Sequence, residues 1–468
     1  MKDIFSELDQ YGKKLAIVTA AEKSVSYATL LADSKKFASG IPERSLVFLL
    51  CGNNYESIIG YIGTVLGHCV PVLLDDKIEK HHLIRLIGLF DPKYIYLPLS
   101  RTNIVNSTVV ISNHHDYGLL ARQRINDYEI HNDLFQLLST SGSTGSAKYV
   151  RQSYRNVESN IGSIKKYLGI RKQDRVITTM PMHYSYGLSM INTHLASGST
   201  IVLSNYSVAQ KQFWDVLRNS RITTFGGVAF TYEILSRIKF GRYDLDSVRY
   251  ITHAGGALNR NTTLNILQMC KENDIRFYTM YGQTEASPRM TYLPWERAFD
   301  KIGSIGISIP GGLCWLENED GGLIKMEYQE GEIVYQGPNV ALGYGESYRD
   351  LAKGDDNQNI LRTGDIGYKD EEGYLFLVGR KSRFVKVYGH RVSLDDIEQV
   401  MLAKGVECAC TGNDDSITIY VTQPNLDDWV LSLLSDVLPR VDQRALSVVY
   451  VSTIPRDVRE KINYSALK

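Results

Sequence analysis

Apolar runs and amphipathic segments alternate along the first part of the chain. Continuous apolar runs at residues 46–50 and 70–74 predict buried strands, and apolar positions at helical spacing over residues 55–66 and 81–89 predict helices. Strand-like runs return at residues 175–179, 200–203, 222–225 and 249–252. This regular alternation predicts an α/β fold in which helices cover mostly parallel sheets.

The pattern changes after about residue 305. Two short strands are expected on either side of the Asp-Gly-Gly turn at residues 320–322, and further strands at residues 331–337 and 373–379. Farther on, strands mix with helices expected at residues 394–402 and 429–434. We therefore predict a large N-terminal domain of helix-covered sheets with a small β-rich subdomain, residues 1–380, and a small α+β C-terminal domain, residues 381–468.

Length and composition agree with this picture. The 468 residues exceed the roughly 250–300 residues that one hydrophobic core supports, so two domains are expected. The 52 basic and 52 acidic residues cancel, so no overall field draws the chain to nucleic acid or an anionic membrane. Six irregularly spaced cysteines favour reduced thiols, and the polar N-terminus lacks a signal core. These features predict a soluble cytoplasmic protein; they specify no oligomeric state.

Two pairs of adjacent histidines, His81-His82 and His114-His115, deserve comparison with metal sites. Neighbouring side chains on one element are expected to point apart, and no carboxylate cluster is expected beside them. The sequence therefore predicts no metal role for either pair.

The sharpest local signal follows an apolar strand that begins near Gln136. Small residues there let backbone N–H groups turn toward an anion, their hydroxyls add donors, and a following lysine adds a mobile positive charge. The ending Ala147-Lys148-Tyr149 lacks the Gly-Lys-Ser/Thr of a Walker A loop. We predict a phosphate-binding loop rather than a flexible linker, formed by Thr140, Ser141, Gly142, Ser143, Thr144, Gly145 and Lys148.

With three later segments, this loop resembles the signature of the acyl-adenylate-forming superfamily, which contains acyl-CoA synthetases, adenylation domains and luciferases. The second segment is YGQTE at residues 281–285, and the third is TGD at residues 363–365, followed by Gly379-Arg380. The fourth is Pro455-Arg456 with Lys461-Ile462. The order and spacing of all four segments match, and the resemblance spans nearly the whole chain.

The resemblance implies an AMP-forming ligase that works in two half-reactions. A carboxylate attacks the α-phosphorus of ATP, pyrophosphate leaves, and the acyl group then passes to a thiol, either of coenzyme A or of a carrier-protein phosphopantetheine. Because both reactants are anionic, the site must neutralise charge and hold the geometry. The implied cofactors are ATP and Mg²⁺, and the implied partners are a small carboxylic acid and, for the phosphopantetheine option, a separate acyl carrier protein.

The same resemblance assigns roles to single residues. Lys461 would bridge the reacting carboxylate and the α-phosphate, Thr284 would contact that phosphate, and Glu285 would hold magnesium. Beyond the loop, the nucleotide would be bound by Gly255, Gly256, Tyr281, Gly282, Asp365 and Arg380. The acid pocket would be formed by Tyr184, Ser185, Tyr186 and Gly227. The small C-terminal domain would be mobile, with Ser382 at the hinge where relatives usually carry Asp or Lys; Glu460 stands beside Lys461 where glycine is usual.

Two alternatives remain open on the sequence alone. The first is an amino-acid-activating ligase that loads a carrier protein; such relatives carry an aspartate where Ser185 stands, and an unpaired buried ammonium is costly. The second is a non-catalytic nucleotide-binding relative, against which the retained Lys148, Glu285, Asp365 and Lys461 argue.

Overall fold

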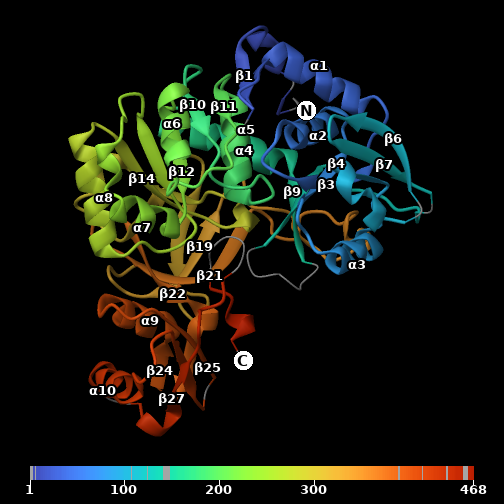
Figure 1. Cartoon of the computed structure of the whole chain (residues 1–468). Coiled ribbons are helices and arrows are strands. Elements are labelled where there is room, and N and C mark those ends of the chain that lie inside the picture. Colours follow the sequence, from blue (N-terminus) through green and yellow to red (C-terminus); the bar gives the residue numbers. More distant parts are fainter. Residues whose placement is uncertain are drawn as a thin grey trace. The chain divides into compact units, whose positions relative to one another are not determined.

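The chain folds into two compact units (Figure 1). The computed structural model describes residues 4–5, 7–19, 21–106, 108–123, 125–140, 148–387, 390–413, 415–438, 441–456 and 462–467. Unit 1 comprises Met1–Cys314 and Tyr335–Leu361, and unit 2 comprises Trp315–Val334 and Arg362–Lys468. The predicted boundary between residues 380 and 381 lies inside unit 2 and stays a prediction, because compact packing is a different criterion from mobility.

One sheet of unit 1 has eight strands. Their order is β20 (Gly343–Gly345), β9 (Tyr149–Ser153), β8 (Leu134–Ser139), β4 (Val70–Asp75), β3 (Leu46–Cys51), β5 (Tyr94–Pro98), β7 (Tyr117–Arg122) and β6 (Thr108–His114). β3 runs parallel to β4 and β5, and every residue of β3 is buried. Burial on both faces explains its continuous apolar sequence.

A second series of strands in unit 1 holds the other predicted parallel strands. The order is β16 (Ser304–Ser308), β15 (Thr291–Leu293), β14 (Arg276–Tyr281), β13 (Tyr250–His253), β12 (Thr224–Gly227), β10 (Arg175–Ile177), β11 (Thr200–Val202), β1 (Leu15–Val18) and β2 (Ser24–Ser26). The strands from β1 to β14 in this order run parallel to one another, and β14, β15 and β16 pair antiparallel. The predicted strand–helix alternation is therefore confirmed.

Helices α7 and α8 illustrate how the sheets are covered, since they pack together and lie over the strands β12 to β14 (Figure 1). The α-helices of unit 1 are α1 (Tyr27–Ala38), α2 (Tyr55–Leu66), α3 (Lys80–Phe90), α4 (Tyr154–Leu168), α5 (Ser185–Leu195), α6 (Lys211–Asn219), α7 (Ala229–Arg237) and α8 (Arg260–Glu272). The start of α4 is fixed by a capping box, in which Ser153 and Asn156 satisfy each other's backbone N–H groups.

Unit 2 contains the predicted antiparallel strands and the C-terminal mixture. Its strands, three of which (β17, β19 and β21) have an end in unit 1, are β17 (Leu313–Glu317), β18 (Leu323–Ile324), β19 (Gly331–Gln336), β21 (Ile360–Lys369), β22 (Leu375–Arg380), β23 (Phe384–Val387), β24 (His390–Ser393), β25 (Cys408–Gly412), β26 (Ile417–Val421) and β27 (Leu446–Tyr450). β17 and β18 pair antiparallel around the Asp-Gly-Gly turn, as predicted. Helices α9 (Leu394–Ala403) and α10 (Asp427–Val437) complete the unit. The predicted α/β fold class is confirmed.

Two further sequence expectations concern cysteines and membranes. All six cysteines are buried and free of disulfides. None of the described helices combines the length and the apolar character that crossing a bilayer requires.

The expectation that the side chains of His81 and His82 point apart, with no carboxylate beside them, is wrong. Their rings lie 4.0 Å apart between centroids, and Glu79 Oε2 lies 3.2 Å from His81 Nδ1. Glu79 directly precedes the first turn of α3, so its carboxylate folds back over the start of the helix. A carboxylate also meets the second pair, since Glu56 Oε1 lies 3.0 Å from His115 Nδ1.

Two buried histidines make stability depend on pH. Burial lowers the pKa of His194 and of His253 to about 4. Both ring nitrogens of His253 lack hydrogen-bond partners among the described residues, and its ring packs against Tyr232 and Phe277. In the unfolded chain these rings titrate near their ordinary pKa of about 6.5.

We expect the free energy of unfolding to fall as the pH drops from about 6.5 to about 4, because the unfolded state binds more protons in that window. Each histidine contributes about 3 kcal/mol to this fall. Denaturant unfolding at a series of pH values measures it. His253→Phe, which suits the aromatic surroundings, should flatten the slope, whereas exposed His68→Asn should leave it unchanged. A slope equal in all three proteins would contradict the assignment.

Candidate active site

The predicted site residues of unit 1 gather where parallel strands end. Gly227 closes β12, Gly255 follows β13, and Tyr281 closes β14. Thr284 and Glu285 come directly afterwards, in the short 3₁₀ helix Thr284–Ala286. The carboxyl ends of parallel strands are the usual place for ligands in α/β sheets, because the loops that follow them converge there.

Lys148 and Glu285 both contact Tyr344. The Lys148 Nζ atom lies 3.9 Å from the centroid of the Tyr344 ring, and the Tyr344 hydroxyl donates to Glu285 Oε1 at 2.7 Å. The register of β20 and β9 explains the first contact, because Tyr344 pairs with Val150 and so shares a face with Lys148. The structure thus brings together two residues that lie far apart in the sequence and that the sequence assigned to phosphate and magnesium.

Glu285 suits a magnesium ion chemically. Its carboxylate is a hard oxygen donor, the kind that Mg²⁺ prefers, and within the described chain no basic side chain forms an ion pair with it. Its backbone is fixed, since Glu285 O accepts from the N–H of Ala341 at 2.8 Å. Its backbone and one carboxylate oxygen are thus both held by hydrogen bonds.

Thr284 is held from two directions. Its Oγ1 lies 3.1 Å from Ser185 Oγ, at the first residue of α5, and its backbone carbonyl accepts from Gln152 Nε2 at 2.7 Å. All three residues are buried. The structure therefore places the predicted acid-pocket residue Ser185 beside the residue predicted to contact the α-phosphate.

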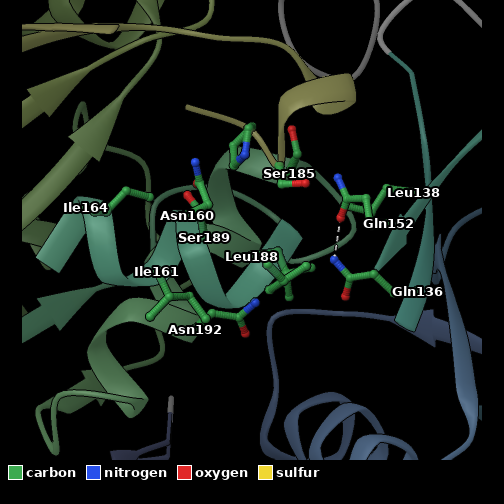
Figure 2. Close-up of a pocket in the computed structure, with 13 residues that line it drawn as sticks. Gln136, Leu138, Gln152, Asn160, Ile161, Ile164, Ser185, Leu188, Ser189 and Asn192 are labelled. Carbon is green, nitrogen blue, oxygen red and sulfur yellow. Dashed lines mark hydrogen bonds between the residues drawn. The ribbon is translucent and has the colours of Figure 1, made fainter. Parts of the chain in front are cut away.

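A continuous chain of hydrogen bonds ends at Thr284. Asn192 Nδ2 donates to the Tyr61 hydroxyl (3.1 Å), Tyr61 donates to Gln136 Oε1 (3.0 Å), and Gln136 Nε2 donates to Gln152 Oε1 (2.7 Å). Figure 2 shows the Gln136–Gln152 bond beside helix α5. Because every link runs in the same direction, each bond polarises the next. This amide chain connects β8 and β9, which flank the phosphate loop, to the Thr284 turn.

The amide chain borders a small cavity of about 10 Å³, room for about one water molecule (Figure 2). Helices α4 and α5 supply most of its wall, including Asn160, Ser185 and Asn192. Asn160 Oδ1, Asn192 Oδ1 and Ser287 Oγ have no hydrogen-bond partner among the described residues. These three oxygens can accept hydrogen bonds from one bound water molecule.

Replacing Gln152 tests the amide chain. Gln152→Glu keeps the shape of the side chain but removes the donor to Thr284 O, leaving a buried carbonyl unpaired at a cost of about 1–3 kcal/mol. We expect a lower melting temperature and about a tenfold slower adenylation, because 1.4 kcal/mol corresponds to a factor of ten. Gln212→Glu, on the exposed side of α6, is the matched control. Equal rates in Gln152→Glu and the wild type would show that the chain does not position Thr284.

Glycines shape the backbone around the predicted nucleotide site. Gly255 has φ +88°, and a Cβ there would meet the Tyr184 hydroxyl at 2.9 Å. A Cβ on Gly282 would lie 1.7 Å from the carbonyl oxygen of Pro288, so no other residue fits. At Gly256 the protein itself leaves room, with Ala229 at 3.6 Å.

The predicted acid pocket is largely aromatic. Tyr186 is buried and its hydroxyl bonds to Thr252 O at 2.8 Å, while Tyr184 packs edge-on against it. A Cβ on Gly226 would meet the Tyr186 hydroxyl at 2.5 Å, and one on Gly227 would meet Thr231 at 2.7 Å. On β12, Gly226 therefore makes room for Tyr186 and Gly227 for Thr231.

In unit 2 the structure brings Asp365 and Arg380 together. Asp365 is buried, and its Oδ1 lies 3.1 Å from Arg380 Nε, as the pairing of β21 with β22 requires. A carboxylate only accepts hydrogen bonds, which is the chemistry that the predicted ribose role needs.

A second charged cluster of unit 2 lies next to the predicted hinge. Ser382 is exposed in the 3₁₀ turn Lys381–Arg383. The adjoining Arg383 lies 2.7 Å from Asp395 and 2.5 Å from Glu398, and its guanidinium stacks 3.9 Å from the centroid of Tyr464. Burial is the largest single influence on Arg383 and lowers its pKa, but Glu398, Tyr464 and Asp395 together raise it. The cluster fixes a residue three positions after Lys461.

Some predicted residues lie outside the described part of the chain. They are Ser141, Gly142, Ser143, Thr144, Gly145 and Lys461, so their roles stay predictions. Thr140 and Lys148, on either side of the loop, are described. Conversely, the structure adds Tyr344 and Gln152 to the site. Nothing in the sequence distinguishes Tyr344 from the other 29 tyrosines. Gln152 could have been recognised, because it is a polar residue within a buried strand.

Comparisons with known proteins agree with this geometry. A family model described as AMP-binding enzyme matches residues 5–345. A 2-succinylbenzoate--CoA ligase of Bacillus pumilus is 29% identical over 352 residues, covering 73% of this chain and 70% of the relative. The corresponding ligase of Listeria innocua is 25% identical over 448 residues, covering 93% and 91%.

Solved structures show the same fold. The O-succinylbenzoate coenzyme A synthetase of Bacillus subtilis in complex with AMP superimposes with a TM-score of 0.82 at 21% identity, covering 100% of this chain and 98% of the other. ATP-bound MatB from Rhodopseudomonas palustris gives 0.81 at 22% identity, covering 99% and 98%. The predicted class, an AMP-forming acid–thiol ligase, is confirmed. This chain belongs to the AMP-binding enzyme family.

Proposed function

We propose that this enzyme uses ATP and magnesium to convert a small carboxylic acid into an acyl-adenylate, with release of pyrophosphate, and then passes the acyl group to the thiol of coenzyme A. The observation that carries this proposal is the meeting of Lys148 and Glu285 at Tyr344. A cation and a carboxylate held at one ring can receive the two halves of a magnesium–triphosphate complex. The predicted cytoplasmic location belongs to the same proposal.

The remaining residues complete the chemistry in this proposal. Bound magnesium would neutralise phosphate charge, and Glu285 would hold it. Lys148 would attract the leaving phosphates, Thr284 would orient the α-phosphate, and Asp365 would accept the ribose hydroxyls. Lys461 would place its positive charge where the negative charge of the transition state develops, which lowers the barrier more than it stabilises the bound substrate.

The acid in this proposal is not an α-amino acid. Ser185, at the position where amino-acid-activating relatives carry an aspartate, is buried and bonded to Thr284. The other predicted pocket residues, Tyr184, Tyr186 and Gly227, offer no carboxylate to an ammonium group, and a buried unpaired ammonium is costly. The ligases of the Bacillus and Listeria relatives are named for 2-succinylbenzoate, which makes this aryl acid the first to test.

Acid-dependent exchange between ATP and labelled pyrophosphate tests the proposal. The panel comprises 2-succinylbenzoate and simple aryl, branched, hydroxy and amino acids, and product formation with coenzyme A or a phosphopantetheinylated carrier protein then separates the acceptors. Exchange with a non-amino acid and transfer to coenzyme A would support the proposal. Measurable ATP binding without exchange for any acid would favour the non-catalytic reading, and exchange with amino acids alone would favour the carrier-loading ligase.

A further inference from the structure

Arg289 is a buried cation without an acidic partner. Its side chain is 3% exposed, and among the described residues no carboxylate forms an ion pair with it. Its neighbours are neutral: the guanidinium lies 4.1 Å from the centroid of Tyr186, Nη2 lies 3.4 Å from Ser189 Oγ, and the Tyr167 side chain also hydrogen-bonds to it. The Nε atom has no hydrogen-bond partner within the described chain. Burying a charge in this way costs several kcal/mol unless an anion compensates it.

The described surroundings of Arg289 leave its Nε donor unpaired. Nε and Nη2 lie on the same edge, which is the edge that binds a carboxylate through two parallel hydrogen bonds. Nε is unpaired, and the 3.4 Å contact of Nη2 with Ser189 is long for a hydrogen bond to a cation. The Ser189 hydroxyl itself donates to Tyr186 O at 2.7 Å. The face of Tyr186 compensates part of the charge by a cation–π contact.

The backbone of Arg289 is fixed close to the reacting centre. Its carbonyl accepts from Asn339 Nδ2 at 2.8 Å and from Asn160 Nδ2 at 3.0 Å. It stands four residues after Glu285 in the same segment. Arg289 is therefore rigidly placed on the turn that carries Thr284.

Helix α5 sets the distance between the Ser185–Thr284 contact and the Ser189–Arg289 contact. Ser185 touches Thr284 at the first residue of the helix, and Ser189, one turn later, touches Arg289. Four residues of α-helix rise about 6 Å along the axis. A short molecule with one anionic group beside Thr284 and a second beside Arg289 matches this spacing.

We infer that the acid substrate carries a second anionic group, most simply a second carboxylate, which binds the Nε–Nη2 edge of Arg289. This inference rests on the proposed function and deepens it: the enzyme activates a short dicarboxylic acid at one end and recognises the other end. Arg289 is then a specificity-determining residue, and its buried charge is retained because the substrate completes the ion pair.

Paired acids that differ in one carboxylate test the inference by pyrophosphate exchange. The pairs are 2-succinylbenzoate with 4-oxo-4-phenylbutanoate, and hexanedioate with its monomethyl ester. The wild type should favour the diacid in kcat/KM by about 10²- to 10³-fold, since truncating one partner of a buried charge pair costs that much. Arg289→Met should reduce the preference to below about tenfold, and exposed Arg237→Met should keep it. Equal use of both acids by the wild type, or a preference that survives in Arg289→Met, would overturn the inference.

A second measurement separates this inference from the proposed function. Ligand-free Arg289→Met should melt at or above the wild-type temperature, because an apolar group of similar volume replaces an uncompensated charge. The diacid should raise the melting temperature of the wild type and leave that of Arg289→Met unchanged, whether or not any acid supports exchange. Absence of exchange would count against the proposed function, whereas equal shifts in both proteins, or none in the wild type, would refute the role of Arg289.

Discussion

Replacement of Lys461 by alanine is expected to slow acyl-adenylate formation by about 10²- to 10³-fold, the usual cost of removing one group that stabilises developing transition-state charge. The reason is that carboxylate and triphosphate are both anionic, and the proposed lysine offsets their repulsion only as they approach. Pyrophosphate exchange with a saturating acid measures the effect. Acid and nucleotide binding should change little, because the interaction strengthens mainly in the transition state.

The control for Lys461→Ala is the rate of the second half-reaction, acyl transfer to coenzyme A. A supplied acyl-adenylate should still be converted to the coenzyme A ester at close to the wild-type rate, since no carboxylate has to approach phosphate in that step. The neighbouring Glu460→Gln variant controls for local charge. Normal adenylation by Lys461→Ala would show that another residue supplies the positive charge.

Replacement of Glu285 by glutamine is expected to lower kcat/KM for ATP by about 10²-fold or more, and to raise the magnesium concentration needed for half-maximal rate. The amide keeps the size of the side chain but lacks the charge that attracts a divalent cation. Rates measured at a series of magnesium concentrations give both numbers. Exposed Glu296→Gln is the control. An unchanged magnesium requirement would remove Glu285 from the metal site.

The fold could largely be predicted from the sequence because its strands are buried on both faces. β3 and β4 are continuous apolar runs, and α2 coincides with its predicted range. Short strands were less clear: β12 is Thr224–Gly227 instead of the expected residues 222–225, and its last two residues, Gly226 and Gly227, have no apolar side chains to mark its end.

The candidate site could be predicted only where a residue lies in a motif. Thr284 and Glu285 belong to YGQTE, and the structure places them beside Ser185 and Tyr344. Arg289 and the Asn192–Gln136–Gln152 chain lie outside any motif, and their meaning depends on contacts between distant segments. The error at His81 and His82 has a similar origin, since the position of Glu79 at the helix start decides where the rings turn.

The contacts of Tyr344 have a thermodynamic consequence. Lys148 and Glu285 place a basic and an acidic side chain at one ring. Glu285 attracts a metal ion and repels a triphosphate, and Lys148 does the reverse; each ligand alone therefore gains one attraction and meets one repulsion. Together the two ligands satisfy both residues. Metal and nucleotide should thus raise each other's affinity by the same factor, as linkage requires. The site would therefore bind the metal–nucleotide complex more tightly than either ligand alone.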